Sequence, residues 1–180
     1  MQEIVYVVDK RDKLVYVNDE WDRFAAANCG EAILSHRVLQ RCIWDFIVDD
    51  RTRNVYEQLL DRARGGHLTM FDLRCDSPDC ERLLTMAIVG IAGELVEFRT
   101  CLVSLAPRRP MLRHDALPAP VDDPLPICGW CRRVQVGGTW MAIDIAARSG
   151  AIAKSRTIAS LSHGICHDCL ERLPVSAMAT

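Results

Sequence analysis

Two Cys-x-x-Cys pairs are the residues of this chain whose type and spacing point most directly to chemistry. Cys128 and Cys131 form the first pair, Cys166 and Cys169 form the second, and residues 132–165 lie between them. Each pair can present two sulfurs from one tight turn, which suits two corners of a tetrahedron. Two such pairs complete the set of four thiolates that Zn²⁺ prefers in structural sites. The spacing therefore predicts a zinc ion held by both segments.

Other chemistries use the same spacing. Rubredoxin-type iron sites use paired cysteines, a disulfide can form within either pair, and thioredoxin-like redox motifs are also Cys-x-x-Cys. Such a redox motif needs no second copy, so the duplication favours a metal, with iron and pure redox chemistry as the alternatives. His163 and His167 lie next to the second pair. Because four cysteines already complete the ligand set, we expect both histidines to lie outside it.

Composition and charge narrow the class of protein. The chain has 180 residues, of which 49% are apolar and 26% charged, with a formal net charge of −2. This balance gives no basic field for nucleic acid or an anionic membrane, and the apolar runs are too short to cross a bilayer. The start of the chain lacks the pattern of a secretion signal, so we expect a cytoplasmic protein. An odd count of nine cysteines does not predict a disulfide framework.

The first hundred residues show the patterns of five strands and two principal helices. Alternating apolar and polar residues in the later strands predict an antiparallel sheet with one face on a core. Helices would cover one face of this sheet, which is an α+β fold. We expect strands at 4–8, 14–17, 67–75, 82–90 and 94–105, a helix at 20–27 capped by Asn18 or Asp19, an irregular stretch at 33–49, and a longer helix from Asp49 or Asp50 to Gly65.

The order of these elements resembles a PAS domain over residues 1–106. The resemblance is carried by residues 7–9 and 14–18, by the Trp-Asp-Phe-Ile segment 44–47, and by the three closing strands. It implies a sensory or dimerising module whose helices and inner sheet face can enclose a ligand. The alternative is a core packed solid by the protein's own side chains.

A ligand pocket in this module would be lined by aromatic and methionine side chains, although such residues also build ordinary cores. His36 and His67 have no supporting motif and do not predict haem. The five cysteines before residue 102 do not lie in the setting of a flavin-adduct photosensor; Cys75 and Cys80 form a weaker pair that could make a reversible disulfide. The candidate pocket residues are Phe24, Trp44, Phe46, Tyr56, Phe71 and Met86.

A proline-rich segment separates this region from the cysteine pairs. Residues 107–126 contain six of the eight prolines, which favours an extended linker between a domain at 1–106 and a tail at 127–173, with a disordered end at 174–180. The tail has too little apolar content for a self-sufficient core, so we expect a metal to supply folding free energy. Within it we expect a strand at 132–136, a Gly137-Gly138 turn, a helix at 140–147 capped by Thr139, and a helical turn at 170–173.

The tail resembles a small cysteine-rich segment found after PAS or other sensory modules in bacterial signalling proteins. Residues 127–133, Trp140 and residues 162–169 carry the likeness. His167 stands where proline is common, and the middle segment is rather long; neither departure removes an expected metal ligand.

The sequence contains no phosphate-binding loop, kinase motif or nucleophile elbow, and a closed four-cysteine site leaves no open position for substrate. We therefore expect a non-enzymatic bacterial signalling protein. Its PAS-like module would sense a ligand or form a homodimer, and its zinc-bound tail would contact a protein partner.

Two other functions compete with this one. In the first, oxidation of the four tail cysteines releases zinc and melts the tail, which would make the chain a thiol or metal redox sensor. In the second, a zinc-ribbon-like tail binds nucleic acid through Arg132, Arg133, Lys154 and Arg156. A solvated basic face is the simpler interpretation of those four cations, so we expect no nucleic-acid partner.

Overall fold

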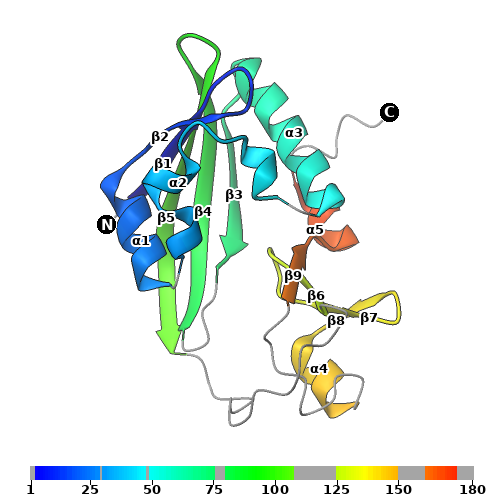
Figure 1. The fold of residues 1–180 in the computed structure, drawn as a ribbon. Helices are drawn as coiled ribbons and strands as arrows, with labels where there is room; N and C mark the ends of the chain where they lie inside the picture. Colours follow the sequence, from blue (N-terminus) through cyan, green and yellow to red (C-terminus); the bar gives the residue numbers. More distant parts are fainter. Residues whose placement is uncertain are drawn as a thin grey trace.

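A five-stranded antiparallel sheet forms the first part of the structure, a computed structural model that describes residues 3–28, 30–47, 49–75, 80–107, 125–149 and 161–173. Its strand order is β2-β1-β5-β4-β3, so β3 lies at one edge (Figure 1). The expected α+β sheet is therefore confirmed. The strands are β1 (Glu3–Val8), β2 (Leu14–Val17), β3 (Thr69–Arg74), β4 (Cys80–Ile91) and β5 (Leu95–Pro107).

One face of this sheet carries the core. On β5, Val96 and Phe98 are fully buried, and on the neighbouring β4 Met86 and Ile88 face the same side. Met70 on β3 points to the other face and is 58% exposed. Successive residues of a strand point to opposite faces, so the alternation seen in the sequence fixes which side chains enter the core.

The helices follow the capping residues expected from the sequence. The Asn18 side chain accepts a hydrogen bond from the Trp21 N–H at the start of α1 (Asp19–Ala27), and Asp49 accepts one from the Thr52 N–H at the start of α3 (Asp50–Arg64). These caps satisfy backbone donors that the first helical turn leaves free. Between the two helices lie η1 (Glu31–Ile33), α2 (Ser35–Val38) and η2 (Ile43–Asp45).

Helix α3 packs on β4 at a glycine. A Cβ added at Gly90 would lie 2.2 Å from the carbonyl oxygen of Ala63, so only glycine allows this approach. Leu59, Leu60 and Ala63 of α3 are buried against the sheet. This packing closes the core over the β4 side of the inner face.

A second, four-stranded sheet forms in the tail, with the order β8-β7-β6-β9. Strands β6 and β9 are parallel, whereas the β6–β7 and β7–β8 pairs are antiparallel. Ile127, Val134 and Ala146 form a small core of their own. The tail elements are β6 (Leu125–Cys128), β7 (Val134–Val136), β8 (Thr139–Met141), α4 (Ile143–Arg148), β9 (Leu161–Gly164) and α5 (His167–Arg172).

The helix predicted at 140–147 is wrong at its start. Gly137 and Gly138 adopt positive φ angles of 55° and 83°, and this turn sends residues 139–141 back along β7 as a strand. Trp140 therefore lies opposite Gln135, and the helix begins only at Ile143. The apolar spacing suited both structures, and the two-glycine hairpin turn decided between them.

The tail shares the main hydrophobic core with the sheet. Ile165 and Leu173 are 1% and 6% exposed and belong to the same buried cluster as Phe98 and Leu59. Trp130 and Leu170 pack against that cluster. The linker predicted at 107–126 is wrong at both ends, because Pro107 ends β5 and Leu125 and Pro126 begin β6. Residues 108–124 and 174–180 lie outside the described residues, so the rest of the linker and the disordered end stay predictions.

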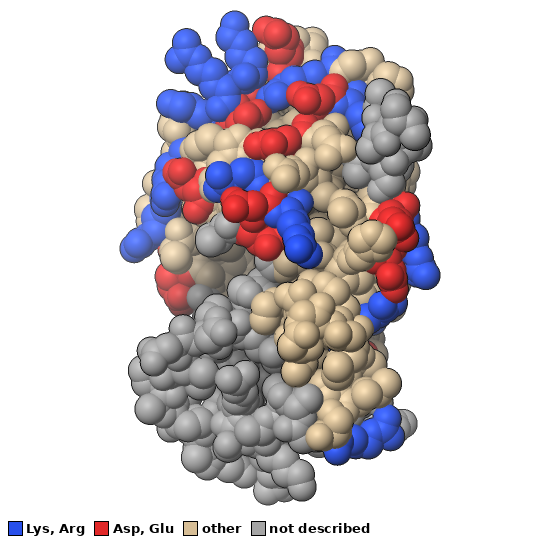
Figure 2. Space-filling view, turned by 90° about the vertical axis from the view of Figure 1, so that its right-hand side faces the viewer, with Lys and Arg blue, Asp and Glu red and all other residues tan. Residues whose placement is uncertain are grey.

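Charges of both signs are interspersed over the upper part of the face drawn in Figure 2, with an area of uncharged residues below them. In the described part of the chain, no helix combines the length and the apolar character that crossing a membrane requires.

Candidate metal centre

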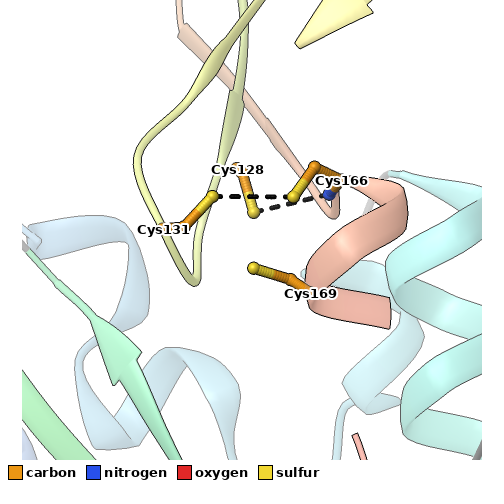
Figure 3. Close-up of side chains that lie close together, drawn as sticks. All are labelled: Cys128, Cys131, Cys166 and Cys169. Atoms are coloured by element: carbon orange, nitrogen blue, oxygen red, sulfur yellow. Dashed lines mark hydrogen bonds between the residues drawn. The ribbon is translucent and has the colours of Figure 1, made fainter. Parts of the chain in front are cut away.

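Four cysteine side chains converge at one point in the tail, from two segments far apart in sequence (Figure 3). Their sulfur atoms all lie within 4.8 Å of one another. Cys131 Sγ and Cys166 Sγ are 3.5 Å apart. Cys128, Cys131, Cys166 and Cys169 are therefore positioned to bind one metal ion, as the spacing predicted.

Parallel pairing of β6 with β9 brings the two segments together. Cys128 lies opposite Gly164 in this pair, and the Gly129 N–H donates to the Gly164 carbonyl at 3.0 Å. These backbone contacts between residues on either side of the segment 132–163 therefore lie next to the cysteine ligands. Pairing of backbone, rather than any local pattern, sets the separation of the two cysteine turns.

Each pair sits in a tight turn of its own. In the first, the Arg132 N–H donates to the Cys128 carbonyl at 2.9 Å, with Arg132 at a positive φ of 63°. In the second, Cys166 precedes α5, and its carbonyl accepts the Cys169 N–H at 3.1 Å. Both turns direct two sulfurs toward the same side, which is the arrangement a tetrahedral ion requires.

Backbone amides and mutual repulsion act on the thiols in opposite directions. Burial disfavours the thiolate of Cys128, but N–H groups, including that of Cys166 at 3.4 Å from the sulfur, bring its pKa below the ordinary value. Burial and the charge of Cys128 raise the pKa of Cys131 to about 11 and also raise that of Cys169. Four thiolates this close need a cation between them, and a coordinated metal favours thiolate over thiol.

The centre has a buried side and an open side. Cys128 and Cys166 are buried, Cys169 is half-buried and Cys131 is exposed. The two cysteine segments are further linked by an ion pair between Arg133 and Asp168, which holds the pKa of that carboxyl below its usual range. Of the four thiols, Cys131 in the first turn is therefore the most accessible to water.

The neighbouring histidines occupy different places. His167 is 76% exposed and its Nδ1 lies 3.5 Å from Glu171, so it does not join the four sulfurs. The side chain of His163 lies outside the described residues. Of the described cysteines outside this cluster, Cys42 and Cys101 are free thiols.

Five of the six candidate pocket residues gather in the main core, and one does not. Met86 is buried, Trp44, Phe46, Tyr56 and Phe71 pack against the cluster around it, and the Tyr56 hydroxyl lies 3.8 Å from the Met86 sulfur. Phe24 is not part of this cluster; the guanidinium of Arg82 lies 5.5 Å from its ring centroid.

The pocket residues predicted from the sequence did not include three aromatic residues of this region, Tyr6, Phe98 and Trp130. Tyr6 stacks on Phe98 with ring centroids 4.5 Å apart, and Phe71 lies 6.1 Å from the ring of Trp130. Alternation within β1 and β5 could have placed Tyr6 and Phe98 on the inner face. Trp130 was assigned only to a cysteine turn, because nothing in the sequence shows the tail folding onto the sheet.

Two of the four basic residues considered for nucleic-acid binding form ion pairs with acidic residues of this chain. Arg132 binds Glu81 and Arg133 binds Asp168. Lys154 and Arg156 lie outside the described residues.

Comparison with protein-family models found no match, and comparison with curated proteins found no similar sequence. The class is therefore defined by the structure alone: an α+β protein with a four-cysteine cluster positioned to bind a metal.

Proposed function

We propose that the chain is a non-enzymatic bacterial signalling protein of the cytoplasm, built from a PAS-like sensory or dimerising module and a tail stabilised by zinc. The convergence of four thiols within 4.8 Å carries this proposal. A closed set of four protein ligands serves structure rather than catalysis, because it leaves no position for a substrate or a reactive water. The protein then acts by binding a partner through the tail.

Zinc is the metal that this setting favours. Four sulfurs from two turns suit zinc or iron, and in a structural role zinc adds no redox chemistry of its own. The small tail core of Ile127, Val134 and Ala146 supports a need for outside stabilisation. Bound zinc would hold the two turns at a fixed separation.

The five-stranded sheet with helices over one face supports the PAS-like part of the proposal. Tyr6, Tyr56 and Phe98 line the inner face, with Tyr56 and Phe98 centroids 6.3 Å apart. Burial raises the pKa of Tyr56 to about 12, and its hydroxyl, which lies 3.8 Å from the Met86 sulfur, is a polar group on this otherwise apolar face. A small, largely apolar ligand is the class that such a face would take.

Elemental analysis of the purified protein, together with its visible absorption spectrum, tests the metal. We expect one zinc per chain and no visible band. Cys166→Ser removes a buried ligand and should lose most of the metal, whereas Cys101→Ser, which changes a thiol outside the cluster, should keep it. Bound iron, or metal content equal in both variants, contradicts the proposed site.

The redox-sensor function is the second candidate. It is favoured by one observation: the sulfur of the exposed Cys131 lies 3.5 Å from the sulfur of the buried Cys166. Hydrogen peroxide would oxidise the Cys131 thiolate to a sulfenic acid, releasing one water once a proton is taken up. The Cys166 thiol would then attack that sulfur, forming a disulfide and releasing a second water. Zinc, having lost two ligands, would leave.

A zinc-sensitive dye followed during peroxide treatment separates the two functions. The sensor function requires release of zinc that a thiol reductant reverses, together with a disulfide between Cys131 and Cys166 in the protein that has released its zinc. Zinc that stays bound through peroxide treatment leaves only the structural role.

A further inference from the structure

We propose that the metal centre controls the docking of the tail on the sheet edge at β3 and on the start of α3, so that zinc occupancy is transmitted to the inner face of the sheet. The proposal rests on the metal binding proposed above and adds to it a regulatory contact. It predicts that the sheet and the metal site influence each other, although no metal ligand belongs to the sheet.

The first cysteine turn is bonded to the end of the edge strand. Arg74, the last residue of β3, donates its backbone N–H to the carbonyl of Gly129 at 3.0 Å. Gly129 lies between the ligands Cys128 and Cys131. A change in the geometry of that turn therefore moves the partner of an edge-strand amide, which would otherwise face water.

Trp130 makes the second contact of this turn. Its ring lies 6.1 Å from that of Phe71 on the inner face of β3 and packs against the main core. Its indole Nε1 is buried and has no hydrogen-bond partner among the described residues. Burying a donor without a partner opposes docking. The ring is therefore held by packing and by the fixed geometry of the turn.

A charged contact lies beside the ring. Glu81 at the start of β4 accepts from Arg132 of the first turn at 3.3 Å and from Arg74 of β3 at 3.0 Å. Hydrogen bonding to Arg74 and the charge of Arg132 hold the pKa of Glu81 below its usual value. One carboxylate thus links tail and sheet, although its partial exposure keeps the contribution small.

The second cysteine segment docks on α3. Ile165, next to Cys166, is 1% exposed within the main core. A Cβ added at Gly164 would lie 3.4 Å from a carboxylate oxygen of Asp49, the residue that caps α3. Figures 1 and 3 both draw α5 beside the beginning of α3.

The two segments thus contact different elements of the sheet domain, and a zinc ion on the four sulfurs would add a bridge to the β6–β9 pairing and the Arg133–Asp168 ion pair that already join them. With zinc bound, the two cysteine turns are fixed to each other, so the Trp130 and Ile165 contacts reinforce each other; without zinc, the strand pairing and the ion pair couple the turns more loosely. Coupling of this kind is reciprocal in free energy. Weakening the Trp130–Phe71 contact should therefore weaken zinc binding, and removing zinc should loosen the end of β3.

Zinc affinity, measured by competition with a chromogenic chelator, tests whether the Trp130–Phe71 contact strengthens zinc binding. Phe71→Ala changes no ligand and should weaken zinc binding about tenfold, a typical size for coupling between two sites. Met70→Ala is the matched control, because Met70 is the preceding residue on the same strand but faces away from the core. Its zinc affinity should equal that of the unaltered protein. Equal affinity in a folded Phe71→Ala variant overturns the proposal.

Hydrogen exchange on the unaltered protein tests whether removing zinc loosens the end of β3. It also tests the proposed coupling if Phe71→Ala does not fold. Removing zinc under conditions in which the sheet stays folded should speed exchange of the Arg74 amide, while amides in the β1–β5 pair stay protected. Unchanged exchange at Arg74 overturns the proposal. A protein that holds no zinc contradicts the proposed function as well, whereas zinc bound without either effect contradicts the coupling alone.

Discussion

The surroundings of each side chain set its pKa, and the cysteines show how the pKa of one thiol group depends on its position. Cys101 lies beside Glu3, where burial and the carboxylate raise its pKa, and it is not one of the four clustered thiols. Cys128 is surrounded by backbone N–H groups, which favour its thiolate. Cysteine is therefore a half-buried thiol that stays protonated in the sheet and a candidate metal ligand in the tail.

Asp22 is a second residue whose surroundings define a measurable role. Its carboxylate accepts the backbone N–H of Ser35 at 2.7 Å and the Ser35 hydroxyl at 2.6 Å, tying α1 to the start of α2. These bonds lower the pKa of Asp22 from its ordinary value of 3.8. A lowered folded-state pKa stabilises the protein above pH 3.8, and that stabilisation is lost as the pH falls through the folded value.

We therefore expect Asp22→Asn to lower the melting temperature at pH 7 and to have a smaller effect near pH 3. Thermal unfolding followed by circular dichroism at both pH values measures this. Asp19→Asn is the control on the same helix, since the Asp19 side chain is 94% exposed. An equal shift at the two pH values would show that the carboxylate charge is not involved.

Packing between elements depends on a few close approaches, and the contact of α3 with β4 is the tightest of those that involve a glycine. Gly90→Ala places a methyl group 2.2 Å from the Ala63 carbonyl oxygen, so helix and strand must move apart. We expect a loss of about 1–3 kcal/mol in the free energy of unfolding, the usual cost of overpacking a core. Urea denaturation measures it.

Gly65→Ala provides the comparison for this change. Gly65 ends the same helix at a negative φ, and the nearest atom to an added Cβ there is 3.3 Å away. The neighbours need move only a few tenths of an ångström, so we expect a clearly smaller loss. A Gly90→Ala protein as stable as Gly65→Ala would contradict the described packing.

Over the whole molecule, tail and sheet share one hydrophobic cluster that contains Ile165, Leu173 and Phe98. A domain that shares its core with a neighbour unfolds with it, because exposing one side removes burial from the other. We expect tryptophan fluorescence and far-ultraviolet circular dichroism to report the same denaturation midpoint in the zinc-loaded protein. Two separated transitions would show that the tail folds independently.

Removing zinc should then lower the stability of the whole protein and not only of the tail. A ligand present at about 1,000 times its dissociation constant stabilises the state that binds it by about 4 kcal/mol. Adding a strong chelator should shift the fluorescence and dichroism midpoints together toward lower denaturant. A shift confined to the tail signal would contradict the shared core.

Local patterns in the sequence predicted much of the first region. Alternation marked the strands, and the beginnings of α1 and α3 were located to within one residue, because period-two burial and helix caps depend on neighbours in sequence. The structure then chose Asn18 over Asp19 and Asp49 over Asp50 as the capping residues. The tail was less predictable. Residues 139–141 carried a helical spacing, but pairing with β7 made them a strand. Strand pairing depends on a partner segment, which the local pattern does not contain.

Ligand type and the spacing within each pair are local properties, so the amino-acid sequence was enough to predict that four cysteines in two turns could bind one ion. The position of that centre depends on tertiary contacts that no local pattern contains. The parallel β6–β9 pair joins the turns, and burial of Ile165 and Trp130 places them against β3 and α3. Those contacts join residues far apart in the chain, and they form because the apolar surface that each region lacks is supplied by the other.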